Sequence, residues 1–275
     1  MRLSVTLTCQ YDSPFSPFAA SNFDEGLKWA ATCGLDGVEL CIADYNDMSV
    51  AKKAETLNKK LAEYGLACPT ISTGQAFGRE NIALASENED SRDLAINRLI
   101  MHIDAASILG SRVTIGLIRG KAEGLRQKDA ASRMVSALGI LLVHAQKKGV
   151  TLLIEPMNRY ETTFINNASE AVQFLALMDN PINLQILWDT FHANIEETDF
   201  THPINKMGKS LGHVHFADSN RFFPGFGHID FEAIGKALKE IRYNGWLSLE
   251  CLDKPEHNTI INHTPALIER LKSWG

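Results

Sequence analysis

Four potential metal ligands end apolar, strand-like runs in the second half of the chain: Glu155, Asp189, His215 and Glu250. A carboxylate at the end of a buried strand is costly to desolvate unless a cation or a proton neutralises it. Three carboxylates beside one imidazole would repel one another if left bare, and a divalent ion would relieve that repulsion. Mostly oxygen ligands with one nitrogen favour Mn²⁺, with Mg²⁺ or Co²⁺ as alternatives, over structural Zn²⁺. We therefore expect one divalent metal ion here; the alternative is four unrelated strand-end ion pairs.

Polar residues near the expected ligands are candidates for substrate binding. Glu161, His192 and Arg221 lie in the loops that follow three of the ligands. Each by itself is typical of a solvated loop residue, but their shared position after metal-ligand strands favours substrate contact. His213 shares its strand face with His215 at a deeper layer. There a hydrogen-bonded core histidine is favoured over a further ligand.

The elements that must position these residues alternate between strand and helix along the whole chain. Apolar runs predict strands over residues 3–8, 37–42, 66–72, 112–118, 150–155, 184–189, 211–217 and 245–252. Helical spacing predicts helices over residues 23–33, 50–64, 91–109, 129–148, 169–178, 231–243 and 264–273, with a short turn at 190–192. Runs without alternation are typical of strands covered on both faces in a parallel sheet.

Eight strand–helix alternations predict an α/β fold, a closed (β/α)₈ TIM barrel. The length of 275 residues suits one such barrel, and no linker-like segment divides the chain, so residues 1–275 are expected to form one domain. The four ligands are spaced by about one strand–helix unit each. Since the carboxyl ends of barrel strands lie on one face, the ligands are expected to converge there.

Composition limits which cellular compartment and which binding partners we expect for this protein. A formal net charge of −6 argues against a nucleic-acid partner, which clustered Lys and Arg would attract. Five cysteines are odd in number and unevenly spaced, as is typical of reduced thiols in a cytoplasmic protein. The first residues are too short an apolar run for a signal peptide, and no stretch approaches a membrane span. We expect a cytoplasmic protein without a membrane or nucleic-acid partner.

Two loops have both a structural and a ligand-binding interpretation. Phe15 and Phe18 follow the first strand, where a loop folded onto its own core is favoured over the wall of a substrate pocket. The loop 224–228, Pro-Gly-Phe-Gly-His, could cradle a phosphate group after the seventh strand. A tight turn that needs positive φ is favoured there, because no Lys or Arg follows the glycines closely.

With these motifs, the chain resembles the xylose-isomerase-like barrel superfamily, and within it the metal-dependent ketose 3-epimerases of the D-tagatose/D-psicose type. The resemblance covers nearly the whole chain and is most specific at residues 155–161 (Glu-Pro-Met-Asn-Arg-Tyr-Glu), 189–192, 213–221 and Pro224-Gly. It implies that Glu155, Asp189, His215 and Glu250 bind the metal and that Glu161, His192 and Arg221 bind the sugar. The implied reaction inverts the carbon next to the ketone through a cis-enediolate.

In that reaction Glu155 and Glu250 would act as the acid/base pair, one on each face of the sugar. A closer likeness is to epimerases of keto-hexonates such as 5-keto-L-gluconate and D-tagaturonate, at residues 71–77, 115–120 and 194–197. Gln75, in the first of these segments, is an expected substrate contact. Arg119 is expected to end the fourth strand near the barrel mouth and to pair with a substrate carboxylate.

Other functions stay open from the sequence. The same scaffold serves aldose–ketose isomerases of the hydroxypyruvate- or xylose-isomerase type and inosose dehydratases, which differ in the carbon that is deprotonated. An abasic-site endonuclease is disfavoured by the acidic charge and by strands three and four, which supply no histidine ligands. A non-catalytic sugar-binding barrel is disfavoured by the complete ligand set. The expected partner is a small sugar or sugar acid, and the resemblance implies a dimer or tetramer.

Overall fold

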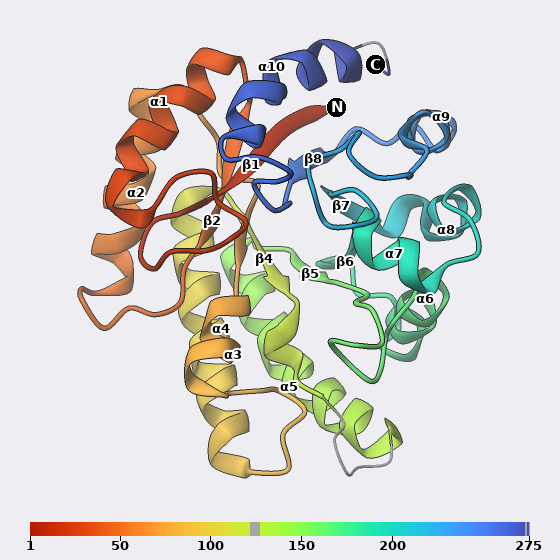
Figure 1. Ribbon diagram of the computed structural model, residues 1–275. Coiled ribbons are helices and arrows are strands. Elements are labelled where there is room, and N and C mark those ends of the chain that lie inside the picture. The colour runs from red at the N-terminus through yellow and green to blue at the C-terminus, as the bar shows by residue number, and fades with distance from the viewer. Residues whose placement is uncertain (122–126, 273, 275) are drawn as a thin grey trace.

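The chain folds into a closed barrel of eight parallel strands in sequence order, in a computed structural model that describes residues 1–121, 127–272 and 274 (Figure 1). The strands are β1 (Arg2–Thr8), β2 (Gly37–Cys41), β3 (Thr70–Ser72), β4 (Arg112–Ile115), β5 (Leu152–Ile154), β6 (Leu184–Asp189), β7 (Leu211–Phe216) and β8 (Trp246–Leu249). Pairing of β8 with β1 closes the barrel. The predicted (β/α)₈ TIM barrel is confirmed.

Helices surround the strands on the outside of the barrel (Figure 1). They are α1 (Phe23–Cys33), α2 (Val50–Glu63), α3 (Gly74–Glu80), α4 (Glu89–Leu109), α5 (Gln127–Lys148), α6 (Ala168–Leu177), α7 (Thr190–Glu196), α8 (Thr201–Met207), α9 (Phe231–Glu240) and α10 (Thr259–Lys272). Short 3₁₀ turns are η1 (Ala20–Asn22), η2 (Leu117–Arg119) and η3 (Gly208–Ser210). Local sequence sets several ends: α1 stops at Gly34, which takes the left-handed conformation with φ of 85°.

The structure corrects several expected boundaries. Helices α3 and α8 were not expected, and α7 extends the expected short turn; all three are short and carry glycine, proline or asparagine, which weakens a helical pattern. The fourth strand ends at Ile115 rather than at residue 118, so Arg119 lies in η2 and not at a strand end. Helix α10 begins at Thr259, before the expected start; Ser273, its expected end, lies outside the described residues.

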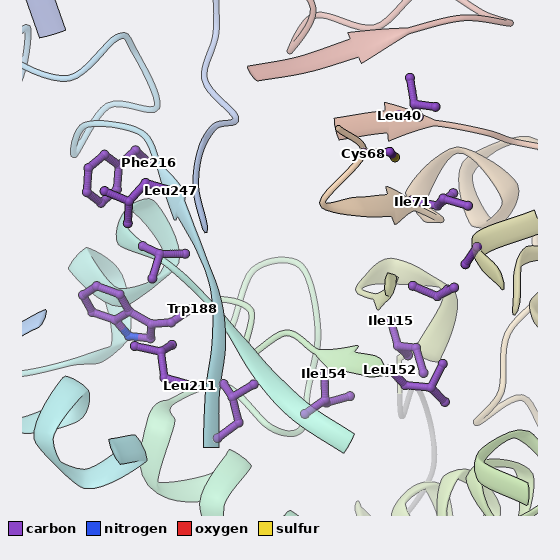
Figure 2. Close-up of a cluster of buried hydrophobic side chains, with 14 of the residues drawn as sticks. Leu40, Cys68, Ile71, Ile115, Leu152, Ile154, Trp188, Leu211, Phe216 and Leu247 are labelled. Carbon is purple, nitrogen blue, oxygen red and sulfur yellow. The ribbon is translucent and has the colours of Figure 1, made fainter. Parts of the chain in front are cut away.

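The barrel has an apolar outer layer and a polar interior. Figure 2 shows Leu40, Ile71, Ile115 and Ile154, from four successive strands, in the buried hydrophobic cluster between strands and helices. Because successive strand residues face opposite sides, their neighbours point to the barrel axis. These buried interior residues are largely polar: Thr6, Glu39, Thr70, Thr114, His213, His215 and Ser248. The helices therefore stabilise the barrel from outside, and its interior is free to carry chemistry.

Two leucines of α4 test this arrangement by the same substitution. Leu99 is fully buried, whereas Leu94 on the same helix is 55 % exposed. We expect Leu99→Ala to lower the free energy of unfolding by about 2–5 kcal/mol because it leaves a cavity, and Leu94→Ala to change it by less than about 0.5 kcal/mol. Urea unfolding followed by tryptophan fluorescence measures both. Equal losses would contradict the burial of this helix face.

Candidate metal and substrate site

The four expected metal ligands meet at the carboxyl ends of β5 to β8. Glu155 follows β5, Asp189 ends β6, His215 lies in β7 and Glu250 follows β8. Each offers one ligand atom, and these four atoms lie within 4.8 Å of one another. Gly116 allows this approach, because a Cβ there would stand 2.7 Å from Glu155 Oε2. The sequence-predicted set therefore converges on one point at the barrel mouth.

Several ligand atoms in this cluster are buried without a hydrogen-bond partner. Asp189 caps α7 by accepting the amide hydrogen of Phe191 with Oδ1 at 2.7 Å, which leaves Oδ2 unpartnered. Nδ1 of His215 is also unpartnered, 3.7 Å from Glu155 Oε1 and 3.4 Å from Glu250 Oε2. Three carboxylates and one imidazole nitrogen with free lone pairs fit a divalent cation that prefers oxygen ligands.

The charges of the cluster are poorly neutralised by the protein itself. Burial raises the pKa of Asp189 to about 8, with Arg221 opposing the shift and Glu250 adding to it. Burial and the nearby Glu250 also raise the pKa of Glu155. Burial alone would raise the pKa of Glu250 as well, but attraction to His215 and Arg221 outweighs it and the pKa is lowered. A bound cation would favour the ionised form of all three carboxylates.

The expected substrate residues surround this cluster. Arg221 places Nη1 3.1 Å from Glu161 Oε1 and Nη2 3.3 Å from Glu250 Oε2. Its guanidinium carbon lies over the rings of Phe15 and Phe191, at 4.4 and 4.8 Å from their centroids. Such stacking on two aromatic faces holds a cation in a fixed orientation. Phe15 thus forms part of the site wall, the interpretation that the sequence disfavoured.

Asn158, which the sequence analysis did not single out, connects two of these residues. It is 1 % exposed, and its Nδ2 donates to Glu161 Oε1 at 3.0 Å and lies 2.7 Å from His192 Nδ1. Because an amide nitrogen donates, Nδ1 of His192 accepts and its hydrogen sits on Nε2. That Nε2 is buried and unpartnered, 3.8 Å from both Glu155 Oε1 and Asp189 Oδ2. Burial also lowers the pKa of His192, which keeps the ring neutral.

A cavity of about 380 Å³ opens beside the cluster. Its walls include Phe15, Gln75, Met157 and Leu117 together with the acidic side chains of Asp12, Glu155, Glu161 and Glu250. Gln75 donates through Nε2 to the carbonyl of Tyr11 at 3.0 Å, and its Oε1 is buried without a partner. Cavities of this size suit a small ligand held by a few polar groups.

Arg119 does not lie where the sequence suggested. Its side chain is fully buried, and it is not among the residues that line the cavity. Nη1 donates to the carbonyl of Glu155, and Nη2 donates to the carbonyl of Ile165 at 3.2 Å. Burial lowers the pKa of this guanidinium to about 10, with Glu155 opposing the shift. The expected position is therefore wrong: η2 turns Arg119 into the protein, where it donates to the backbone carbonyl of Glu155, just after β5.

The side chain of Asp218 organises the glycine-rich loop after β7. The buried carboxylate of Asp218 accepts amide hydrogens from Ser219 at 2.7 Å, Gly225 at 2.7 Å and Ile229 at 3.2 Å. A Cβ at Gly227 would stand 2.1 Å from Asp218 Oδ1. These three amides already donate to Asp218 and are therefore not available to a phosphate group. The same loop holds Arg221 at φ of 61°, an unusual backbone for a non-glycine residue.

Among the described residues no helix is both long and apolar enough to cross a membrane.

Comparisons with known proteins agree with this geometry. Residues 27–273 match the family described as xylose isomerase-like TIM barrel. A D-psicose 3-epimerase of Agrobacterium fabrum is 38 % identical over 84 % of this chain and 80 % of its own length. A ketose 3-epimerase of Arthrobacter globiformis is 30 % identical over 82 % of this chain and 77 % of its own. The solved structure of an L-ribulose 3-epimerase superposes with a TM-score of 0.84 at 26 % identity, covering 99 % of this chain and 95 % of that one.

The raised pKa values predict that metal uptake strengthens as the pH rises. A proton on Asp189 must leave before its carboxylate can bind a cation, and its pKa of about 8 places this loss in an accessible range. We expect the affinity for Mn²⁺ to rise between pH 6 and pH 8, by up to about tenfold per pH unit for each proton displaced. Titration calorimetry in two buffers of different ionisation enthalpy measures both affinity and proton release. A Kd that stays constant over this range would contradict the assignment.

Proposed function

This chain belongs to the xylose isomerase-like TIM barrel family, and on that basis we propose that it is a divalent-metal-dependent sugar epimerase. Relatives that are ketose 3-epimerases support an isomerase-type enzyme that acts on a sugar. One observation carries the proposal: the ligand atoms of Glu155, Asp189, His215 and Glu250 lie within 4.8 Å of one another beside a cavity of sugar size. The proposed ion is Mn²⁺, and the proposed reaction inverts C3 of a ketose.

Inversion of a carbon next to a ketone needs a proton removed from one face of the sugar and returned to the other. Glu155, Asp189, His215 and Glu250 would hold the metal ion. When bound there, a divalent ion supplies Lewis-acid chemistry that makes the carbon beside the carbonyl more acidic. The sugar passes through a cis-enediolate, which is planar at the reacting carbon and accepts a proton from either side.

Glu250 and Glu155 are the proposed proton carriers. The lowered pKa of Glu250 favours its ionised form, which suits the residue that takes the proton. Glu155, at the end of a different strand, is then the residue that returns a proton to the other face of the sugar. In the reverse direction the two residues exchange roles. Both side chains line the cavity, so each reaches a sugar bound between them.

Two donors are available to the oxygen that gains negative charge. The Nε2 hydrogen of His192 has no partner within the protein, and Asn158 fixes this tautomer from the other side of the ring. The guanidinium of Arg221 is held by contacts with two aromatic rings and by Glu161. Donors that are already oriented stabilise charge as it develops without reorganising at the moment of reaction.

Conservative substitution of each glutamate tests the proton-transfer roles. We expect Glu155→Gln and Glu250→Gln to lower kcat by about 10²–10⁴-fold, because each removes a proton carrier. An amide oxygen still coordinates a hard cation, so metal content is expected to stay near one ion per chain. Exchange of the carbon-bound proton in D₂O, followed by NMR, measures turnover.

Glu63→Gln, on the exposed face of α2, is the matched control and should retain full activity. Near-normal exchange in either cavity variant would remove that glutamate from proton transfer. Full activity of the protein after chelation of divalent ions would overturn the metal-dependent reaction itself.

The charge of the cavity favours a neutral sugar over a sugar acid or phosphate. Its described lining includes four acidic side chains: Asp12, Glu155, Glu161 and Glu250. The same lining includes one arginine, Arg221, which already contacts two of these carboxylates. With Asp189 added, five carboxylates outnumber one guanidinium and one divalent ion. A substrate carboxylate would meet repulsion, and Arg119 is buried away from it.

A substrate panel tests this preference. We expect kcat/KM for neutral ketohexoses to exceed that for their C6 carboxylates and C6 phosphates by at least about tenfold, since unpaired like charges cost several kcal/mol at close range. NMR of the products in the presence of Mn²⁺ identifies both the sugar and the inverted carbon. A preference for keto-hexonates would contradict the charge argument, and an aldose product would replace epimerisation by aldose–ketose isomerisation.

A further inference from the structure

A buried carboxylate, Glu39 of β2, lies in the barrel interior beneath the proposed metal site. It is fully buried, and the sequence analysis did not single it out. Its Oε2 is 3.0 Å and its Oε1 3.2 Å from Nε2 of His215. Ser72 donates its hydroxyl hydrogen to Oε1, and Nε2 of His213 lies 3.2 Å from Oε2. One carboxylate is thus the shared acceptor for groups from β3 and β7.

The two ring nitrogens of His215 face opposite partners. An ionised carboxylate can only accept, so Glu39 requires that Nε2 of His215 carries a hydrogen. The lone pair is then available on Nδ1, the nitrogen that faces Glu155 and Glu250. A carboxylate that binds the far side of a ligand histidine fixes its tautomer and raises its basicity toward the metal.

We propose that Glu39 is a positioning residue that orients His215 and presents its Nδ1 lone pair to the metal ion. This inference rests on the metal site of the proposed function. Glu39 touches neither substrate nor metal; it acts through the imidazole ring. The ring of His213 stands edge-on to that of His215 at 5.2 Å between centroids, which limits its rotation further.

The position of Glu39 in the barrel explains why a carboxylate is stable there. Its oxygens face the hydroxyl of Ser72 and the Nε2 atoms of His213 and His215. Polar groups from β3 and β7 therefore surround this carboxylate in place of solvent. Its neighbour in the β1 register is Thr6, a buried residue whose hydroxyl has no partner and which offers a matched control.

Metal binding in the absence of substrate tests the inference. We expect Glu39→Ala to weaken Mn²⁺ binding by about 10–100-fold, the usual effect of losing such a partner. Glu39→Gln keeps an acceptor of the same shape without the charge and should weaken binding by a smaller factor, above about threefold. Thr6→Val, a substitution of equal size in the same layer, should leave the Kd unchanged. Titration calorimetry measures each Kd, and circular dichroism checks the fold.

A second readout separates positioning from mere stability. In the metal-free wild type, nitrogen-15 NMR should show His215 as the Nε2–H tautomer, and Glu39→Ala should shift it toward a mixture. Binding by both glutamate variants within twofold of Thr6→Val would overturn the inference; if only Glu39→Gln folds, the same threshold applies to it.

The outcomes for the metal site and for Glu39 are distinguishable. If the wild type takes up no divalent ion, or if Asp189→Ala leaves uptake unchanged, the proposed metal site fails and the inference fails with it. If the wild type binds one ion and the Glu39 variants bind it equally well, the inference alone fails. Two ions per wild-type chain would make Glu39, His213 and His215 a ligand group, since their ligand atoms also lie within 4.8 Å of one another, and would overturn the positioning role.

Discussion

Mutual repulsion between carboxylates at the mouth of the barrel is the constraint on which this site depends. Glu155, Asp189 and Glu250 are drawn together by the closure of the barrel and are largely removed from water. His215 and Arg221 neutralise part of this charge, while burial and the neighbouring carboxylate of Glu250 raise the pKa values of Glu155 and Asp189. A divalent cation is the natural complement of such an arrangement, because it replaces repulsion by attraction for all three acids.

A layer of supporting contacts turns this cluster into an oriented site. Glu39 lies below His215, and Asn158 lies behind His192, so both rings meet a partner on the side away from the cavity. Asp218 gathers three backbone amides and thereby shapes the loop that carries Arg221. These contacts leave the outward-facing nitrogen atoms unpartnered. The protein therefore leaves these nitrogen atoms available for the proposed metal ion and sugar.

The sequence predicted most of the fold and the convergence of the four proposed ligands, but not the residues that support them. Each of the four proposed ligands ends an apolar run, so its position could be recognised in the sequence. Asn158 is one polar residue among several in its loop, and its contact with His192 spans 34 residues. Glu39 is a charged residue within an apolar strand, but its histidine partners lie in β7, far away in the sequence. Arg119 was misplaced because a 3₁₀ turn after Gly116 reversed its direction.

The sequence by itself determined the alternation of strands and helices, since hydrophobic periodicity is a local property that needs no partner. It also determined that acids and histidine would share one face, because every parallel strand of a barrel ends there. Tertiary structure decided which side chains touch: Glu39 with His215 across the interior, Asn158 with His192, and Arg119 with backbone carbonyls away from the cavity. Such pairings depend on the exact spacing of strands that are far apart in the sequence. The order of residues alone does not reveal that spacing.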